Sequence, residues 1–360
     1  MNALADALAR RIRDGGPLGL DSYMAAALGD PQHGYYAKGA PIGAAGDFIT
    51  APEISQVFGE LIGLWCVAAW QALGAPDPVI LAELGPGRGT LMADALRAQR
   101  VAPGFAAARR LHLVETGEAL RARQAEALAA AHPQWHADVA TLPPGPLLLI
   151  ANEFLDALPI RQFERAADGW HERRVALAAN GAFVFALDPE PADAGFLPAA
   201  LADAPPGAIF ELRPAAEALA RALATRLVRD GGAALFIDYG HERRACGDTF
   251  QAVRRHRRHD PLKAPGTADL TAHVDFAAFA AAARAGGARV WGPVPQGQFL
   301  TALGLDVRVA KLAARATPAQ AATLASATRR LTAPQEMGTL FKAMALTPPE
   351  APAPAGFEAA

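Results

Sequence analysis

Apolar residues along the chain change their spacing near residue 78. Before that point they recur with helical periodicity in 3–13, 20–28 and 54–72, which predicts a helical N-terminal region over residues 1–75. Beyond it, short apolar runs alternate with helical stretches; the runs are 79–83, 111–114, 147–150 and 233–237. This alternation predicts an α/β fold with a mostly parallel, doubly wound sheet over residues 76–346.

Three segments depart from that alternation. Apolar runs between about 160 and 190 are separated by Asp168-Gly169 and Asn180-Gly181, which predicts antiparallel strands inserted into the sheet or extending it. Residues 34–53 form an aromatic, glycine-rich loop, for which we weigh a lid over a site against a plain surface excursion. Residues 347–360 are rich in Pro and Ala and are predicted to be a disordered tail.

Charge and cysteine content exclude several kinds of partner. The chain has 34 Lys and Arg against 36 Asp and Glu, so it has no strong attraction for nucleic acid or anionic membranes. The one dense basic run, 254–259, lacks interleaved aromatic residues and favours a solvated face or a protein-docking loop over nucleic-acid binding. Cys66 and Cys246 lie far apart without metal-ligand spacing, so we expect neither a disulfide framework nor a metal.

Membrane insertion and secretion are also not expected. The longest apolar run, 61–69, is shorter than the roughly 20 residues that cross a bilayer. The N-terminus lacks an uninterrupted apolar stretch followed by a cleavage site. These features predict a cytoplasmic protein.

A glycine-rich turn follows the 79–82 run directly and leads into a predicted helix. Gly85, Gly87 and Gly89 let the backbone approach a ligand, and the helix N-terminus offers free N–H groups; an ordinary tight turn is the alternative. The G-x-G-x-G spacing differs from the dinucleotide pattern G-x-G-x-x-G. Glu83, just before it, suits the ammonium group of S-adenosylmethionine rather than a phosphate. The turn therefore favours S-adenosylmethionine over NAD as the cofactor.

Two acids after the following runs are further candidate cofactor contacts. Glu115 ends the second predicted strand, where a carboxylate can accept hydrogen bonds from both ribose hydroxyls. Asp138 is a candidate acceptor for the adenine amino group. A solvated acid at a strand end is the alternative for Glu115.

Polar residues follow the fourth predicted strand. Asn152, Glu153 and Asp156 come after the 147–150 run, and ligands in open α/β sheets bind beyond the carboxyl ends of the strands. We expect these three to be catalytic, with helix capping by Asn152 as the alternative. Glu211 is a further candidate at a strand end.

Six motifs resemble the MidA-like family of S-adenosylmethionine-dependent methyltransferases. The similarity runs from about residue 17 to 346, in the family's order. The motifs are GDFITAP (46–52), ELGPGRG (83–89), NEFLDALP (152–159), IDYG (237–240), DLTAHVDF (269–276) and QGQFL (296–300).

This resemblance implies a class I, Rossmann-like methyltransferase fold and S-adenosylmethionine as the cofactor. It implies cofactor contacts at Gly85, Gly87, Glu115 and Asp138, and a site wall built from Asn152, Glu153 and the loop of Asp47, where we also expect Thr50. The family includes the mitochondrial assembly factor of respiratory complex I, which symmetrically dimethylates an arginine of a complex I subunit. A protein arginine methyltransferase with such a protein substrate is therefore the leading interpretation.

The mechanism expected for that function depends on carboxylates. A guanidinium has a pKa of about 13.8 and needs acids to orient it and to accept a proton. Glu153 and Asp156 would share one face if their segment were helical, with Asn152 as an amide acceptor. The alternatives are a non-catalytic S-adenosylmethionine-binding scaffold and a nicotinamide dehydrogenase. Oligomeric state stays open, because the apolar 61–72 stretch could cover the sheet or a second copy in a homodimer.

Overall fold

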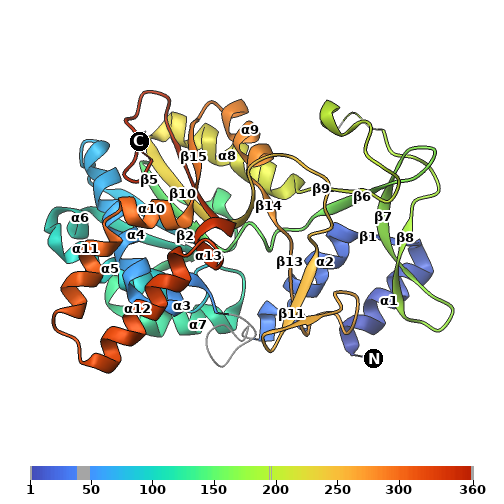
Figure 1. Ribbon diagram of the computed structural model, residues 1–360, viewed down its shortest axis with the longest axis horizontal. Coiled ribbons are helices and arrows are strands. Elements are labelled where there is room, and N and C mark those ends of the chain that lie inside the picture. Colours follow the sequence, from blue (N-terminus) through green and yellow to red (C-terminus); the bar gives the residue numbers. More distant parts are fainter. Residues whose placement is uncertain (1, 39–48, 194, 196, 358–360) are drawn as a thin grey trace.

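A mixed sheet forms the centre of the fold, with strand order β15-β16-β10-β5-β2-β3-β4 (Figure 1). The computed structural model describes residues 2–38, 49–193, 195 and 197–357. Pairs from β10 to β4 are parallel, whereas β16 is antiparallel to β10 and β15, and β14 adds a short parallel strand to β10. This confirms the α/β fold with a mostly parallel sheet. The strands are β2 (Val79–Leu84), β3 (Arg109–Val114), β4 (Gln134–His136), β5 (Leu147–Asn152), β10 (Gly232–His241), β14 (Val274–Asp275), β15 (Arg289–Pro295) and β16 (Phe341–Thr347).

Helices cover both faces of this sheet because alternate residues of each buried strand point to opposite sides. Leu81, Leu148 and Leu235 face one side, and Ala82, Leu149 and Phe236 face the other. The first side is covered by α4 (Gln56–Ala72), α5 (Thr90–Ala98) and α6 (Pro103–Ala108), and the second by α8 (Pro214–Asp230) and α9 (Phe276–Ala285).

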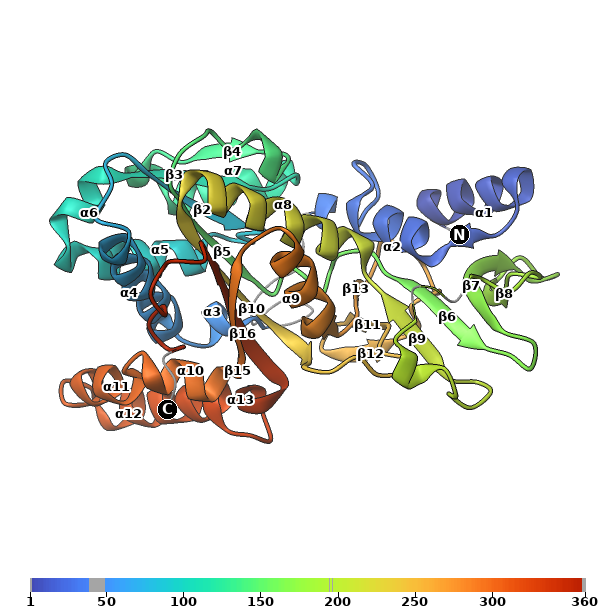
Figure 2. The same ribbon diagram turned by 90° about the horizontal axis from the view of Figure 1, so that it is seen from above.

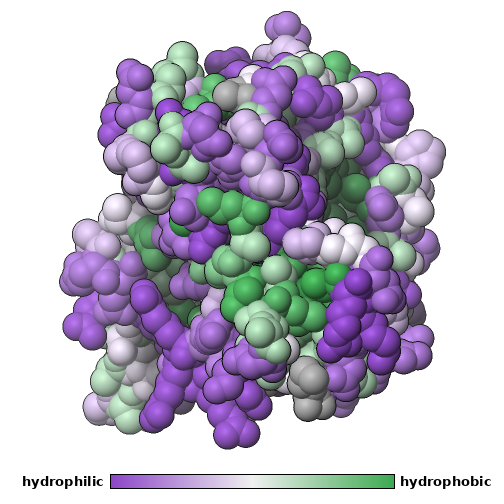
Figure 3. All heavy atoms as spheres, turned by 90° about the vertical axis from the view of Figure 1, so that its right-hand side faces the viewer, coloured by the Kyte–Doolittle hydropathy of each residue, from purple (hydrophilic) through white to green (hydrophobic). Residues whose placement is uncertain are grey.

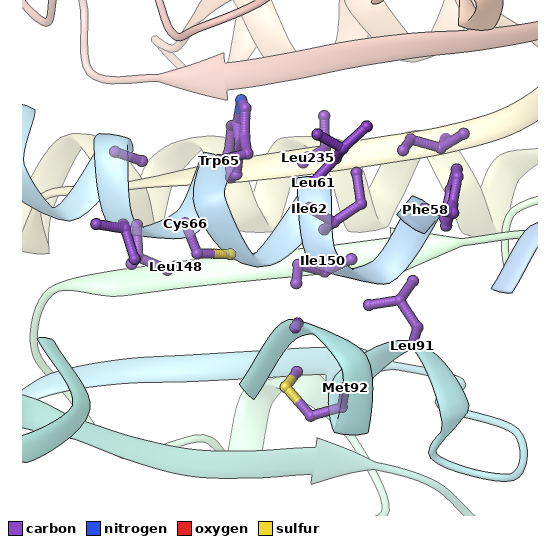
Figure 4. Close-up of a cluster of buried hydrophobic side chains, with 14 of the residues drawn as sticks. Phe58, Leu61, Ile62, Trp65, Cys66, Leu91, Met92, Leu148, Ile150 and Leu235 are labelled. Atoms are coloured by element: carbon purple, nitrogen blue, oxygen red, sulfur yellow. The ribbon is translucent and has the colours of Figure 1, made fainter. Parts of the chain in front are cut away.

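Helix α4 packs on the sheet as a nearly all-round apolar helix. Its Leu61, Ile62 and Trp65 lie against Leu148 and Leu235 in one buried cluster (Figure 4). The apolar 61–72 stretch therefore covers the sheet of its own chain. The helix was expected to begin at Ile54, but the extended backbone of Ser55, with φ at −157°, separates it from the short α3 (Ala51–Ile54).

The antiparallel strands form a sheet of their own rather than extending the main one. Its order is β1-β7-β6-β9, with β8 paired to β7. Helices α1 and α2 pack on it. These helices and strands together form a unit at one end of the molecule, away from α4 to α6 (Figure 2). The elements are α1 (Ala3–Gly15), β1 (Leu18–Gly19), α2 (Leu20–Gly29), β6 (Arg161–Arg165), β7 (Trp170–Leu177), β8 (Phe183–Leu187) and β9 (Ile209–Leu212).

That end of the molecule carries apolar side chains in the middle of its surface, bordered by polar ones (Figure 3). Val184 and Leu187 of β8 are among the exposed large hydrophobic residues.

A third, small sheet has the order β12-β11-β13, from β11 (Gln251–Arg254), β12 (Arg257–His259) and β13 (Asp269–Thr271). The basic 254–259 run is thus the tip of an exposed hairpin.

The C-terminal segment is folded onto the main domain as far as Phe357, which corrects the prediction of a disordered tail. Phe357 is only 8% exposed and its ring lies 5.1 Å from that of Phe299. Burial of this large aromatic ring stabilises the folded segment, although the Pro- and Ala-rich composition on which the prediction relied is typical of disorder. The helices before it are α10 (Gln296–Ala302), α11 (Leu305–Ala313), α12 (Pro318–Thr332) and α13 (Met337–Leu340).

Within residues 2–38, 49–193 and 197–357, no helix is both long and apolar enough to cross a bilayer. Cys66 and Cys246 are both free.

Candidate active site

A cavity of about 300 Å³ lies where β2, β3 and β5 end. This size is at the lower end of the range for small-molecule sites, about 300–1,000 Å³. Its wall combines the glycine-rich turn, the ends of the three strands, the turn after β5 and part of α3. The sequence placed its candidate cofactor and catalytic residues at this same edge of the sheet.

The glycine turn has the left-handed backbone that its composition predicts. Gly85, Gly87 and Gly89 have φ values of 60°, 53° and 82°. Gly85 and Gly87 line the cavity, and a Cβ atom on Gly85 would lie 2.8 Å from Cδ2 of Phe154. Gly89 caps the N-terminus of α5 behind the turn and is not in the cavity wall. The turn thus brings backbone without side chains to the cavity wall at Gly85 and Gly87.

Glu83 is the last acid before the turn and lies in the cavity wall. It is 3% exposed, and its Oε2 has no hydrogen-bond partner. Burial raises the pKa of Glu83 to about 8. An unpartnered, buried carboxyl oxygen in a cavity is an acceptor site for a cationic ligand group, such as an ammonium.

Glu115 also lies in the cavity wall and is held by its neighbours. Its Oε1 accepts the N–H of Gly117 at 2.8 Å, and its Oε2 accepts a hydrogen bond from Gln124 at 3.3 Å. Burial raises the pKa of Glu115. Since a carboxylate has about four lone-pair sites, its two oxygens can also accept hydrogen bonds from ligand hydroxyls.

Gln124 of α7 (Glu118–Ala127) joins Glu115 to the glycine turn, and the sequence did not indicate it. Its Nε2 also donates to the carbonyl oxygen of Gly87 at 2.7 Å, and its Oε1 accepts from Trp135 at 2.9 Å. The residue is fully buried. A glutamine within a charged helix gives no signal of such a role, because its partners come from three other elements.

The structure does not bring Asp138 into the cavity wall. Its side chain is exposed and accepts the N–H of Ala140 at 2.8 Å, while the neighbouring Ala137 lines the cavity. Thr50 lies in the wall as expected. Asp47 and residues 39–48 of the candidate lid loop are outside the described residues.

The segment after β5 is a turn and not a helix, which corrects the geometry expected for Glu153 and Asp156. Glu153 has φ at 49°, a left-handed value that a helix does not allow. The two carboxyl groups therefore do not share a helical face. Glu153 and Asn152 line the cavity, whereas Asp156 is not in the cavity wall and interacts with Tyr239 and Arg213 behind it.

Glu153 and Asn152 present unused acceptor capacity to the cavity. Oε1 of Glu153 accepts the N–H of Ala51 at 2.8 Å and the Nδ2 of Asn152 at 3.2 Å. Oδ1 of Asn152 is buried without a partner. Burial raises the pKa of Glu153 to about 7, a value suited to accepting a proton near neutral pH.

Glu211, the further candidate acid, is not in this cavity. Its carboxylate on β9 accepts hydrogen bonds from Gln162 at 2.7 Å and from the backbone N–H of Thr249 at 3.0 Å. It stabilises the antiparallel unit.

Helix α3 closes one side of the cavity through Pro52 and Glu53, at the end of the predicted loop 34–53. Glu53 accepts a hydrogen bond from the hydroxyl of Thr90 at 2.5 Å, and its other oxygen lies 3.5 Å from Arg88. Tyr36, from the candidate lid loop, and Phe154, from the motif NEFLDALP, are further wall residues that the sequence did not single out as site residues. They come from segments without periodicity, so only the tertiary fold brings them together.

These features fit S-adenosylmethionine. The cavity offers glycine backbone at Gly85 and Gly87, a buried acceptor for an ammonium at Glu83 and a second acid at Glu115 for hydroxyl groups. In the part of the chain that the structure describes, no group of three or more His, Cys, Asp or Glu residues is arranged to hold a metal ion.

Comparisons with known proteins agree with this site. Residues 61–294 match a family model described as "Putative S-adenosyl-L-methionine-dependent methyltransferase". A Drosophila melanogaster protein named protein arginine methyltransferase NDUFAF7 homolog, mitochondrial, is 37% identical over 96% of this chain and 85% of its own length. The human protein arginine methyltransferase NDUFAF7, mitochondrial, is 36% identical over 94% of this chain and 82% of its own length.

A solved structure shows the same fold. A crystal structure of a Burkholderia thailandensis protein bound to S-adenosyl-homocysteine is 32% identical and has a TM-score of 0.82, covering 99% of this chain and 93% of the other. The names of the animal relatives place those proteins in mitochondria, so they give no support to the cytoplasmic location expected from the sequence.

Proposed function

Because this chain belongs to the family of S-adenosyl-L-methionine-dependent methyltransferases, we propose that it transfers the methyl group to an arginine side chain of a protein. The names of the animal relatives, which are protein arginine methyltransferases, support this acceptor. The MidA-like resemblance extends the proposal to an arginine in a respiratory complex I subunit, methylated symmetrically.

The pair Asn152 and Glu153 carries the proposal. A guanidinium is a planar group of N–H donors, and it needs acceptors that are fixed in place. The unpartnered Oδ1 of Asn152 and the carboxyl group of Glu153 lie side by side at the cavity wall and offer that set. We assign both a role in binding the acceptor and Glu153 the role of proton acceptor.

We also propose the cofactor-side contacts. Glu83 would receive the ammonium group, Gly85 and Gly87 would lie under the ligand, and Glu115 would bind the ribose hydroxyls. Thr50 would complete the wall from α3. Gly89, Asp138 and Asp156 lie outside the wall, so they would act through their neighbours.

The chemistry supplied by the bound cofactor is a methyl group on a sulfonium, transferred by direct displacement. The protein's task is then to align the acceptor nitrogen and exclude water, and such positioning can contribute about 7–11 kcal/mol. Asn152 and Glu153 would orient the guanidinium nitrogen. As the new N–C bond forms and the S–C bond breaks, Glu153 would accept the proton that the guanidinium loses.

A labelling experiment tests the proposal. The protein is incubated with methyl-tritiated S-adenosylmethionine and an extract from a strain in which its gene is deleted, since the acceptors there are unmethylated. We expect label in a protein band, and treatment of the extract with protease but not with nuclease should remove it. Label only in nucleic acid or small molecules would contradict the protein-arginine assignment.

A scaffold that binds the cofactor without turnover remains the second candidate. Titration calorimetry with S-adenosylhomocysteine and with NAD separates binding from catalysis. Binding of S-adenosylhomocysteine without any labelled product in the extract would favour the scaffold, and binding of NAD alone would favour a dehydrogenase.

A further inference from the structure

Asp238 lies directly behind the turn that carries Glu153. It belongs to β10, whose register with β5 pairs Ile237 with Asn152, so Asp238 comes level with Glu153 at the carboxyl ends of the two strands. Asp238 is 1% exposed and is not in the cavity wall. It therefore cannot contact a ligand in the cavity directly.

The carboxyl group of Asp238 holds the turn through successive backbone N–H groups. Its Oδ2 accepts those of Phe154 at 3.1 Å, Leu155 at 2.8 Å and Asp156 at 3.2 Å. Its Oδ1 accepts the N–H of Tyr239 at 2.9 Å. Buried N–H groups require partners, and these three in the turn have no strand neighbour to supply them.

The turn needs this support because of the backbone of Glu153. A non-glycine residue at φ of 49° is unfavourable and persists only where its surroundings impose it. The N–H of Glu153 donates to the carbonyl oxygen of Ile237 at 2.8 Å, so β10 fixes the residue on one side while Asp238 fixes the three residues after it. Both contacts come from the same strand.

We propose that Asp238 is a positioning residue that holds Glu153 in its left-handed conformation, with its carboxyl group at the cavity wall. This inference rests on the proposed role of Glu153 in methyl transfer. The left-handed backbone of Glu153 sets the direction of its side chain, since an unstrained turn would point that side chain elsewhere. An acid can receive three converging N–H groups with one oxygen, which a neutral apolar residue in its place could not do.

Replacing Asp238 with Asn tests the inference, with Asp94→Asn as the matched control. Asn keeps one acceptor oxygen but places an amide NH₂ against an N–H group, either of Tyr239 or of the turn. Asp94 is also a buried aspartate, but it pairs with Arg97 on α5 and lies outside the cavity wall. We expect faster hydrogen–deuterium exchange in the peptide containing residues 154–156 only in the Asp238 variant.

The transfer rate should respond in the same variant. With the labelled cofactor and the deletion-strain extract, we expect Asp238→Asn to lose about 100-fold in rate, as small misplacements of catalytic groups do. The titratable groups facing Glu153 are Asp156, Asp238 and Arg330. Burial is the main cause of the raised pKa of Glu153, and a loosened turn would expose its carboxyl group to water. The acidic midpoint of the rate should therefore move from about 7 toward the ordinary glutamate value of about 4.3.

A double mutant distinguishes positioning from general damage. If Asp238 acts through Glu153, adding Asp238→Asn to Glu153→Gln should change the rate by less than about 3-fold, because non-additive effects mark residues that act together. A further loss of about 100-fold in the double mutant would overturn the inference. A wild-type rate and midpoint in Asp238→Asn would also overturn it.

The outcomes separate this inference from the proposed function. A wild-type rate in Glu153→Gln removes Glu153 from the mechanism, whereas loss in Glu153→Gln with no loss in Asp238→Asn refutes only the positioning role. If Asp238→Asn does not fold, Asp238→Glu replaces it. That variant keeps the carboxyl group but is one methylene longer, so it should displace the turn and lower both the rate and the midpoint.

Discussion

Oε1 of Glu153 accepts the N–H of Ala51 at 2.8 Å. This hydrogen bond joins the turn after β5 to the first residue of α3. The N-terminal end of α3 lines the cavity with Pro52 and Glu53 and with Thr50 just before it. One carboxyl group therefore serves the proposed acceptor site and the wall of the cofactor site. The two roles can be separated by substitution.

Glu153→Gln should retain cofactor binding and lose transfer. The glutamine can still accept the N–H of Ala51 but cannot take up a proton, so we expect an unchanged Kd for S-adenosylhomocysteine and a rate lower by about 10²–10⁴-fold. Glu153→Ala should in addition weaken S-adenosylhomocysteine binding, because the N-terminus of α3 loses its partner. Calorimetry and the labelling assay measure both. Equal Kd values in the Ala and Gln variants would show that the hydrogen bond between Glu153 and Ala51 does not support cofactor binding.

Cofactor binding should release a proton through Glu83. In the free protein at pH 7 this residue is largely protonated, because burial raises its pKa to about 8. A bound ammonium lowers that pKa, so up to about one proton leaves on binding at pH 7, and the release vanishes once the pH exceeds about 9. Calorimetry with S-adenosylhomocysteine in buffers of different ionisation enthalpy counts the protons. An identical count in Glu83→Gln would remove Glu83 from the ammonium site.

Gly85→Ala should weaken S-adenosylhomocysteine binding by about 10-fold or more, equivalent to at least 1.4 kcal/mol. The new Cβ would lie 2.8 Å from Phe154, at a φ of 60° that L-residues disfavour. Gly181→Ala is the matched control, since Gly181 has φ at 81° with no atom within 4 Å of a Cβ and lies in a hairpin outside the cavity wall. It should lower Tm while leaving Kd unchanged. Equal Kd changes in both variants would exclude a local effect.

Gln124→Leu should weaken cofactor binding without removing a residue of the cavity wall. The carbonyl of Gly87 and the N–H of Trp135 would lose their partner, at a cost of about 1–3 kcal/mol for buried groups. Gln162→Leu is the control, because Gln162 is equally buried but pairs with Glu211 and Asp248 in the antiparallel unit. We expect a higher Kd for S-adenosylhomocysteine only in the Gln124 variant. The same Kd in both variants would mean that the glycine turn keeps its conformation without Gln124.

The sequence predicted the features that depend on local pattern. Alternation of short apolar runs with helices identified the parallel sheet, and the glycine turn with Glu83, Glu115 and Asn152-Glu153 placed the candidate site at the edge of the sheet where the cavity lies. Both predictions rest on periodicity and on the geometry of parallel strands, which do not depend on contacts between distant segments.

The features that the sequence missed depend on contacts between distant segments. The sequence could not show that residues 153–156 form a turn, in which Asp238, more than 80 residues later, accepts three backbone N–H groups. Gln124 and Tyr36 reach the site through tertiary packing alone. Phe357 folds the tail back through one buried ring, against a composition typical of disorder.

We propose that this methyltransferase modifies arginine, with Glu153 as the proton acceptor. The most direct test is amino-acid analysis of the protein fraction after the tritiated reaction, comparing the wild type with Glu153→Gln. We expect the wild type to place label in methylated arginine, and the Gln variant to bind S-adenosylhomocysteine normally but leave arginine unlabelled. Label in another amino acid, or equal labelling of arginine by both proteins, would contradict the account.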